Sequence, residues 1–131
     1  MRKDLEEKLI NDFPGLYTQV TWSKEKTCMC WGFDIDDGWF NIVYDLSKKI
    51  TEIAPEVQAL QVKEKYGGLR FYIGEVLNEH ADIIYKLIYD AEEKSFKTCE
   101  LCGTIENVTT NEQNWIKTLC DNCRKGETNI G

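Results

Sequence analysis

Four cysteines near the end of the chain stand in two pairs, and this arrangement constrains the fold more than any other feature. Cys99 and Cys102 form the first pair, and Cys120 and Cys123 form the second. Two intervening residues let a tight turn direct both sulfur atoms of a pair to one ion, and Gly103 allows the backbone to fold under it. The spacing predicts a closed, structural Zn²⁺ site, although four thiolates also suit iron.

The residues around the two pairs predict a zinc ribbon, in which each pair lies at the end of a short hairpin. The connecting strands are expected within residues 106–110 and 115–119. Residues 99–125 hold too little apolar material to fold alone, so folding there should be coupled to metal binding. The predicted organisation is an α+β core over 1–97, a zinc ribbon over 98–125 and a flexible tail over 126–131.

Composition and charge exclude several classes of protein. The chain has 131 residues, 42% of them hydrophobic, which suits one compact globular domain. No apolar run approaches the ~20 residues that span a bilayer, and the charged start does not read as a signal peptide, so a cytoplasmic protein without membrane contact is expected. The net charge of −7 disfavours an extensive nucleic-acid surface.

Hydrophobic periodicity predicts three helices before the first cysteine pair. They cover residues 3–13, 39–53 and 79–95, with Asp37 and Asn78 as N-caps of the second and third. Residues 16–22 and 28–35 are expected to form a first hairpin. The predicted fold class is α+β, with a small antiparallel sheet packed against two to three helices and a C-terminal zinc ribbon.

A second hairpin is predicted over residues 59–73, because Gly67-Gly68 suits a two-residue turn. That turn would place Tyr66 opposite Leu69, Glu64 opposite Phe71 and Val62 opposite Ile73. Glu64 then falls on the apolar face, where an unpaired carboxylate is costly. Glu64 therefore reaches the sheet edge, is paired, or indicates a different register.

The polar face of this hairpin is the one local basic patch in an acidic chain. Lys63, Lys65, Arg70 and Tyr72 project from it and are predicted to bind a partner. The alternative is an ordinary solvated sheet face.

Three other groups of residues are interpreted as structural. Cys28 and Cys30 read as small core residues rather than a second metal or redox pair. His80 lacks an evident catalytic partner. Asp34, Asp36 and Asp37 are explained by helix capping rather than by Mg²⁺ or Ca²⁺, because the calcium-loop pattern is absent.

Several blocks together resemble a family of small uncharacterised proteins encoded by phages, prophages and bacteria. The blocks are Asp37-Gly38-Trp39-Phe40, the run from Gln61 to Tyr72 (QVKEKYGGLRFY), Ala91-Glu92-Glu93-Lys94-Ser95 and the two cysteine pairs with Trp115 and Thr118-Leu119. The likeness covers roughly residues 30–124. It implies a phage or mobile-element origin and supplies no catalytic residues.

The sequence therefore predicts a non-enzymatic zinc-ribbon binding protein, acting as an inhibitor or adaptor of a host protein. The alternative is a nucleic-acid-binding regulator that uses the ribbon and the patch of Lys63, Lys65 and Arg70. A third class, an enzyme, would need a pocket that joins His80 to Asp34 or Asp36.

Overall fold

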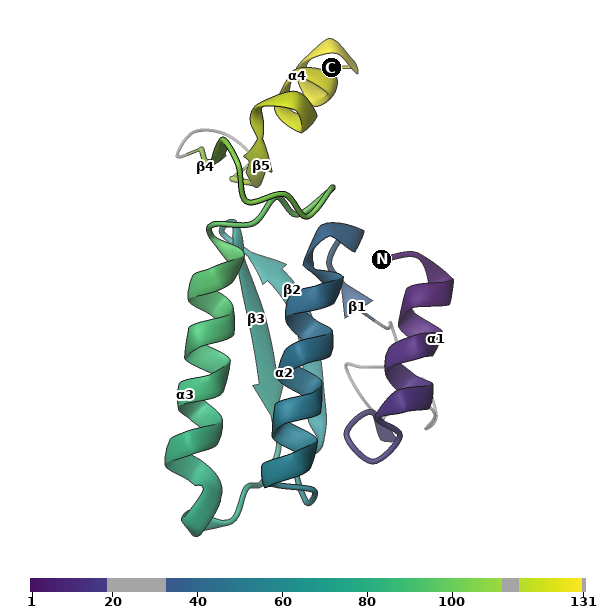
Figure 1. Ribbon diagram of the computed structural model, residues 1–131, viewed down its shortest axis with the longest axis vertical. Coiled ribbons are helices and arrows are strands. Elements are labelled where there is room, and N and C mark those ends of the chain that lie inside the picture. Colours follow the sequence, from purple (N-terminus) through teal and green to yellow (C-terminus); the bar gives the residue numbers. More distant parts are fainter. Residues whose placement is uncertain (19–32, 112–115, 131) are drawn as a thin grey trace.

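The computed structural model describes residues 1–18, 33–111 and 116–130, and it confirms the expected α+β fold. Figure 1 shows a three-stranded sheet with helices packed along it and the cysteine-rich segment at one end of the molecule. We call residues 1–97 the core and residues 98–125 the ribbon. The elements in chain order are α1 (Lys3–Asp12), β1 (Phe33–Asp34), the 3₁₀ helix η3 (Asp37–Trp39), α2 (Phe40–Ile53), β2 (Ala59–Lys65), β3 (Gly68–Ile73), α3 (Asn78–Ser95), β4 (Val108–Thr110), β5 (Thr118–Cys120) and α4 (Asp121–Ile130).

The larger sheet has the strand order β1-β2-β3, and it is mixed rather than purely antiparallel. β2 and β3 pair antiparallel as expected, but β1 runs parallel to β2, with Phe33 opposite Val62. The reason is the crossover: α2 carries the chain along the sheet and back to the start of β2, which leaves both strands pointing the same way.

Residues 16–18 are the described part of the first strand of the predicted first hairpin, and they do not pair with β1. Leu16 and Tyr17 lie in a turn and Thr18 has 3₁₀-helical geometry, so the predicted strand is wrong for these residues. The rest of the predicted 16–22 strand, and residues 28–32 of the second strand, lie outside the described residues.

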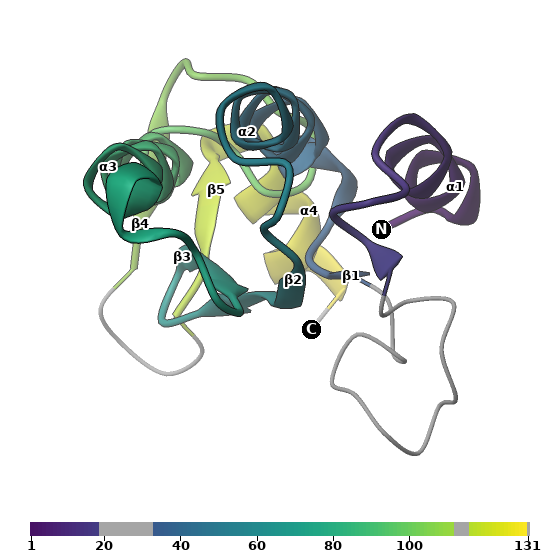
Figure 2. The ribbon, with the colours of Figure 1, turned by 90° about the horizontal axis from the view of Figure 1, so that it is seen from below.

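The three predicted helices of the core are confirmed, and Figure 2 shows α3, α2 and α1 side by side in one layer beside the sheet. One apolar face of α2 and one of α3 are buried, and Val62, Leu69 and Phe71 of the sheet belong to the same buried cluster. Burial of each valine, leucine, isoleucine or phenylalanine side chain among them contributes roughly 1.5–3 kcal/mol to stability. The helix residues buried in this way are Ile42, Val43, Leu46, Ile50, Ile84, Ile88 and Ala91.

Neither predicted helix cap forms. Asp37 makes no capping bond; its carboxylate accepts a hydrogen bond from the Arg2 backbone N–H (2.7 Å) and lies 3.6 Å from the Arg2 guanidinium. Asn78 is the first residue of α3, and its side chain makes no capping bond. The Glu56 carboxylate serves that end of the helix instead, accepting from the Leu77 N–H (3.2 Å).

The turn of the second hairpin lies one residue earlier than predicted. Lys65 pairs with Gly68, so Tyr66 and Gly67 form the loop, and both have positive φ (53° and 86°). Two positive φ values are typical of a type I′ turn, whose twist matches that of the strands. The predicted pairing of Tyr66 with Leu69 is therefore wrong, and Tyr66 is 66% exposed.

The shifted turn changes each cross-strand partner but keeps the two faces of the hairpin. Glu64 lies opposite Leu69, and Val62 lies opposite Phe71, which corrects the predicted register. Glu64 stays on the face that contacts the core. Its carboxylate is paired there, because it accepts a hydrogen bond from the Gly67 N–H (2.7 Å) in the turn.

The ribbon contains the two expected strands. β4 and β5 pair antiparallel, with Thr109 opposite Leu119. α4 follows directly, and the segment predicted as a flexible tail lies within this helix as far as Ile130.

Candidate metal centre

The four predicted ligands come together at the end of the ribbon. The sulfur atoms of Cys99, Cys102, Cys120 and Cys123 all lie within 4.8 Å of one another. Those of Cys102 and Cys120 are 3.7 Å apart, whereas a disulfide bond measures about 2.0 Å, and all four are free thiols. A tetrahedral ion with metal–sulfur bonds of about 2.3 Å separates its ligands by about 3.8 Å. The cluster therefore fits one metal ion, and the described residues hold no second group of this kind.

The first cysteine pair is shaped by its backbone. The Gly103 N–H donates to the Cys99 carbonyl (2.9 Å), and the Cys99 N–H donates to the Thr104 carbonyl (2.9 Å). Gly103 has a φ of +82°, as a glycine in this turn should. Burial acts to raise the pKa of the Cys99 thiol, but backbone N–H groups of both pairs donate to its sulfur and lower the pKa to about 7. The turn thus favours the thiolate that a metal ion needs.

The second cysteine pair joins a strand to a helix. Cys120 ends β5, and Cys123 lies in the first turn of α4, where its N–H donates to the Cys120 sulfur (3.5 Å). Burial and the three neighbouring sulfur atoms raise the pKa of Cys123. Four thiolates are unfavourable in so small a space without a cation, and a bound metal ion supplies that charge.

The first contact between ribbon and core is made by backbone groups. The Gly38 N–H donates to the Glu100 carbonyl (2.7 Å), and the Trp39 indole N–H donates to the Thr98 carbonyl (2.9 Å). A Cβ atom on Gly38 would overlap the backbone oxygens of Cys99 and Glu100. Only glycine permits this approach, so η3 is fitted directly against the first cysteine turn.

The second contact involves the tip of the β2–β3 hairpin. The Thr118 hydroxyl donates to the Gly67 carbonyl (2.6 Å) and hydrogen-bonds the Thr110 hydroxyl (2.6 Å). The strands of the ribbon thus rest on the hairpin turn. Two of the sequence blocks quoted above, 37–40 and 61–72, therefore contribute to one joint between core and ribbon.

Glu100 is a buried carboxylate in this joint that the sequence did not reveal. It is 3% exposed, while its neighbour Leu101 is 42% exposed. One carboxylate oxygen accepts from the Asp36 N–H (3.1 Å), and the other is buried with no partner among the described residues. Burial raises the pKa of Glu100 to about 7. Glutamate is rarely buried, and nothing in the sequence marks this one as an exception.

The predicted basic residues share one sheet face. Lys63 lies opposite Arg70, on the side of the strands that alternates with the buried core residues. Lys65 is exposed and Tyr72 is 44% exposed. The guanidinium of Arg70 lies 3.8 Å from the Glu92 carboxylate, which offsets part of its charge.

The remaining candidates are not brought into one site. Cys28 and Cys30 lie outside the described residues. His80, near the start of α3, hydrogen-bonds the Glu56 carboxylate (2.9 Å), and this bond lowers the pKa of Glu56. Asp36 lies beside the ribbon, whereas α3 begins at the far end of the molecule (Figure 1). The structure therefore does not join His80 to the aspartates.

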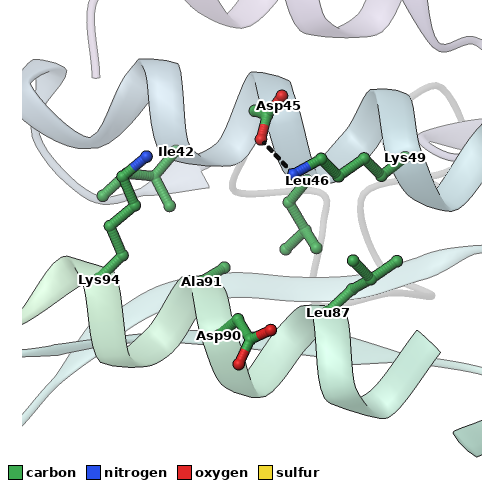
Figure 3. A pocket seen from close by; sticks show the side chains of 8 residues that line it. All are labelled: Ile42, Asp45, Leu46, Lys49, Leu87, Asp90, Ala91 and Lys94. Carbon is green, nitrogen blue, oxygen red and sulfur yellow. Dashed lines mark ion pairs between the residues drawn. The ribbon is translucent and has the colours of Figure 1, made fainter. Parts of the chain in front are cut away.

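A groove between α2 and α3 has about 80 Å³ of space (Figure 3). Apolar side chains form its floor, and Asp45 and Lys49, which pair at 2.9 Å, stand at its rim with Asp90 and Lys94. Small-molecule sites usually need roughly 300 Å³ or more. The groove is a packing seam rather than a ligand site.

Comparison of the chain with models of protein families, with curated proteins and with solved structures finds no match. Among the described residues, no helix has the length and apolar character to cross a membrane. The chemistry of the cysteine cluster is thus the main guide to function.

Proposed function

We propose that this chain is a non-enzymatic zinc-ribbon protein of phage or mobile-element origin that binds a host protein as an inhibitor or adaptor. The observation that carries the proposal is the cluster of four cysteine sulfurs. Zn²⁺ favours four thiolates in tetrahedral geometry, and such a site has no vacant position for a substrate. The metal therefore holds the two cysteine pairs of the ribbon together, and the exposed surface is left for binding.

The binding surface in this proposal is the sheet face that carries Lys63, Lys65, Arg70 and Tyr72. Lys63 and Arg70 are directly opposite each other across the two strands. Like charges in this position destabilise a sheet. Glu92 offsets part of the Arg70 charge, and an acidic group on a partner would relieve the remaining repulsion, which supports a role in binding.

The expected partner is an acidic segment of a protein. Exposed tyrosine beside lysine also suits stacked bases and phosphates, which is the basis of the nucleic-acid alternative. The net charge of −7 opposes that alternative, and so does the ribbon. Four thiolates around Zn²⁺ carry a charge of about −2, in addition to the excess of acidic residues there.

The test is affinity capture from a bacterial lysate treated with nuclease, followed by mass spectrometry. The bait is the zinc-loaded chain, compared with the double variant Lys63→Glu/Lys65→Glu. Arg70 is left unchanged because it pairs with Glu92. The double variant Lys3→Glu/Lys48→Glu is the matched control, since both lysines are exposed and lie on helices away from the hairpin.

The proposal expects one host protein to be enriched equally by the wild type and the control and at least tenfold less by Lys63→Glu/Lys65→Glu. Equal enrichment by all three baits, each with one bound zinc, would mean that this sheet face does not bind the partner. Capture that depends on nucleic acid and weakens steeply with salt would favour the regulator instead.

A further inference from the structure

Two acidic segments meet at the end of the molecule away from the ribbon. Residues 50–62 and 71–85 meet there: the Gly74 N–H donates to the Gln58 carbonyl (2.9 Å). Neither segment contains lysine or arginine, and the single histidine is bonded to Glu56. The acidic residues of the two segments are Glu52, Glu56, Glu75, Glu79 and Asp82.

This acidic end also exposes large apolar side chains. Leu77 is 52% exposed, Ile83 47% and Tyr85 54%. Single exposed apolar residues are ordinary on a protein surface. These three lie within nine positions of an acidic segment, so they are grouped rather than isolated. Exposed tyrosine is typical of protein–protein contact surfaces, because its ring is apolar and its hydroxyl is polar.

A cleft of about 500 Å³ lies at the same place. Its walls combine the carboxylates of Glu56 and Glu75 with the side chains of Val76, Leu77 and Tyr85. Glu56 uses one oxygen for its bonds to Leu77 and His80, and Glu75 is exposed with no ion pair among the described residues. The cleft is thus large enough for a long side chain and negative enough for a cation.

We propose that this cleft binds a lysine or arginine side chain from an extended, basic segment of a partner protein. The carboxylates accept hydrogen bonds from the cationic group, and the ring of Tyr85 attracts the same charge. Val76 and Leu77 contact the apolar stem that both side chains carry. Exposed Ile83, farther along α3, suits an apolar residue of the same segment.

Two other occupants fit the cleft less well. A metal ion needs several close ligand atoms, and within the described residues only the cysteines provide such a group. A second copy of the chain, docked through its own acidic end, would place like charges together. The proposal goes beyond the basic hairpin face, which lies toward the ribbon, and it can fail or succeed independently of that face.

The test is a calorimetric titration of the zinc-loaded full chain with an acetylated, amidated heptapeptide of alternating leucines and basic residues. The matched peptide replaces arginine by citrulline and lysine by norleucine, which keeps the length and removes the charge. The variant is Glu75→Gln/Tyr85→Ser, and the control variant is Glu93→Gln/Tyr66→Ser. All four residues are exposed, so both variants should fold, and bound zinc confirms it.

The proposal expects the basic peptide to bind the wild type and the control variant with equal affinity. It should bind Glu75→Gln/Tyr85→Ser at least tenfold more weakly. The neutral peptide should show no detectable binding to the wild type. Changes in the amide chemical shifts of Gly74 and Leu77 in a parallel NMR titration would place the peptide in the cleft.

Equal binding of the neutral peptide, or equal binding to both variants, overturns the proposal. Binding of agmatine as tight as that of the peptide assigns the cleft to a free amine. A dimer that Glu75→Gln/Tyr85→Ser disrupts assigns it to a second copy.

Discussion

The core and the ribbon are stabilised by different physical means. Among the residues that the structure describes, twenty hydrophobic residues are buried in one cluster of the core, whereas the buried cluster of the ribbon consists of Leu119, Cys99 and Cys120. The other buried side chains in the described part of the ribbon are polar: Thr98, Glu100 and Thr118. Burial of apolar surface can hold the core, but so little apolar surface cannot hold the ribbon against the entropy of its chain. We therefore expect the ribbon to need the metal ion that its four cysteines can hold, and the core to fold without it.

Removing the metal should have the largest effect and should be confined to one region. Structural zinc contributes about 10 kcal/mol or more to the folding of small zinc domains. We expect chelation, or the substitution Cys120→Ser, to unfold the ribbon while the core stays folded. Hydrogen exchange followed by mass spectrometry should show rapid exchange in residues 98–125 and continued protection in α2 and the buried side of α3.

A cysteine-to-serine change outside the cluster provides the control. Cys30→Ser should retain one zinc per chain, measured by elemental analysis of protein purified without chelator. Loss of protection in α2 on chelation would mean that core and ribbon form one cooperative unit. A chain without bound metal but with a protected ribbon would contradict the comparison altogether.

The joint between the two regions should show the next largest effect. In Gly38→Ala the new methyl group meets the backbone oxygens of Cys99 and Glu100, which cannot move as a flexible side chain can. We expect a loss of about 2–3 kcal/mol in the free energy of unfolding, together with weaker zinc binding, since the first cysteine turn is displaced. Urea unfolding with buffered zinc measures the first, and competition with a chromophoric chelator measures the second.

Gly15→Ala is the matched control for that substitution. A Cβ atom on Gly15 has no neighbour within 4 Å, so the change should alter stability by less than about 1 kcal/mol and leave zinc affinity unchanged. Equal losses for both variants would mean that the close approach of Gly38 to the ribbon is not energetically important.

The sequence predicted what depends on strong local patterns. The clustering of the four cysteines followed from their spacing, and the three core helices followed from apolar periodicity. The hairpin followed from its glycines, but its register did not. The turn requires positive φ at two consecutive residues. Tyr66 is one of these residues, although tyrosine seldom adopts a positive φ.

What the sequence did not predict depends on contacts between distant segments. Asp37 and Asn78 are good capping residues by type, yet Asp37 bonds Arg2, and Glu56 takes the capping position at α3. The parallel pairing of β1 required knowing where α2 returns the chain. Glu100 is the clearest case, because its burial results from a joint that only the folded core and ribbon create together.

Glu100 should show the smallest effect, and its sign depends on pH. Its pKa in the folded protein is raised to about 7, above the value of about 4.3 for an unfolded chain. As pH rises between these values the unfolded chain loses the proton first, so this group lowers the stability of the fold. Glu100→Gln removes the buried charge and can keep the bond from the Asp36 N–H. We compare the free energy of unfolding of the variant with that of the wild type at pH 5.5 and at pH 8. The difference in favour of the variant should be about 1–2 kcal/mol larger at pH 8.

Glu106→Gln is the control for this last change, because Glu106 is exposed on the same loop of the ribbon and loses the same charge. Urea unfolding of both variants at the two pH values, with zinc in excess, separates burial from net charge. A gain at pH 8 that both variants share would trace the effect to the overall charge of −7. A loss of stability in Glu100→Gln alone at pH 8 would mean that the ionised carboxylate holds the joint. The ribbon would then need both its metal and a buried charge, and the contrast with the apolar core would be sharper still.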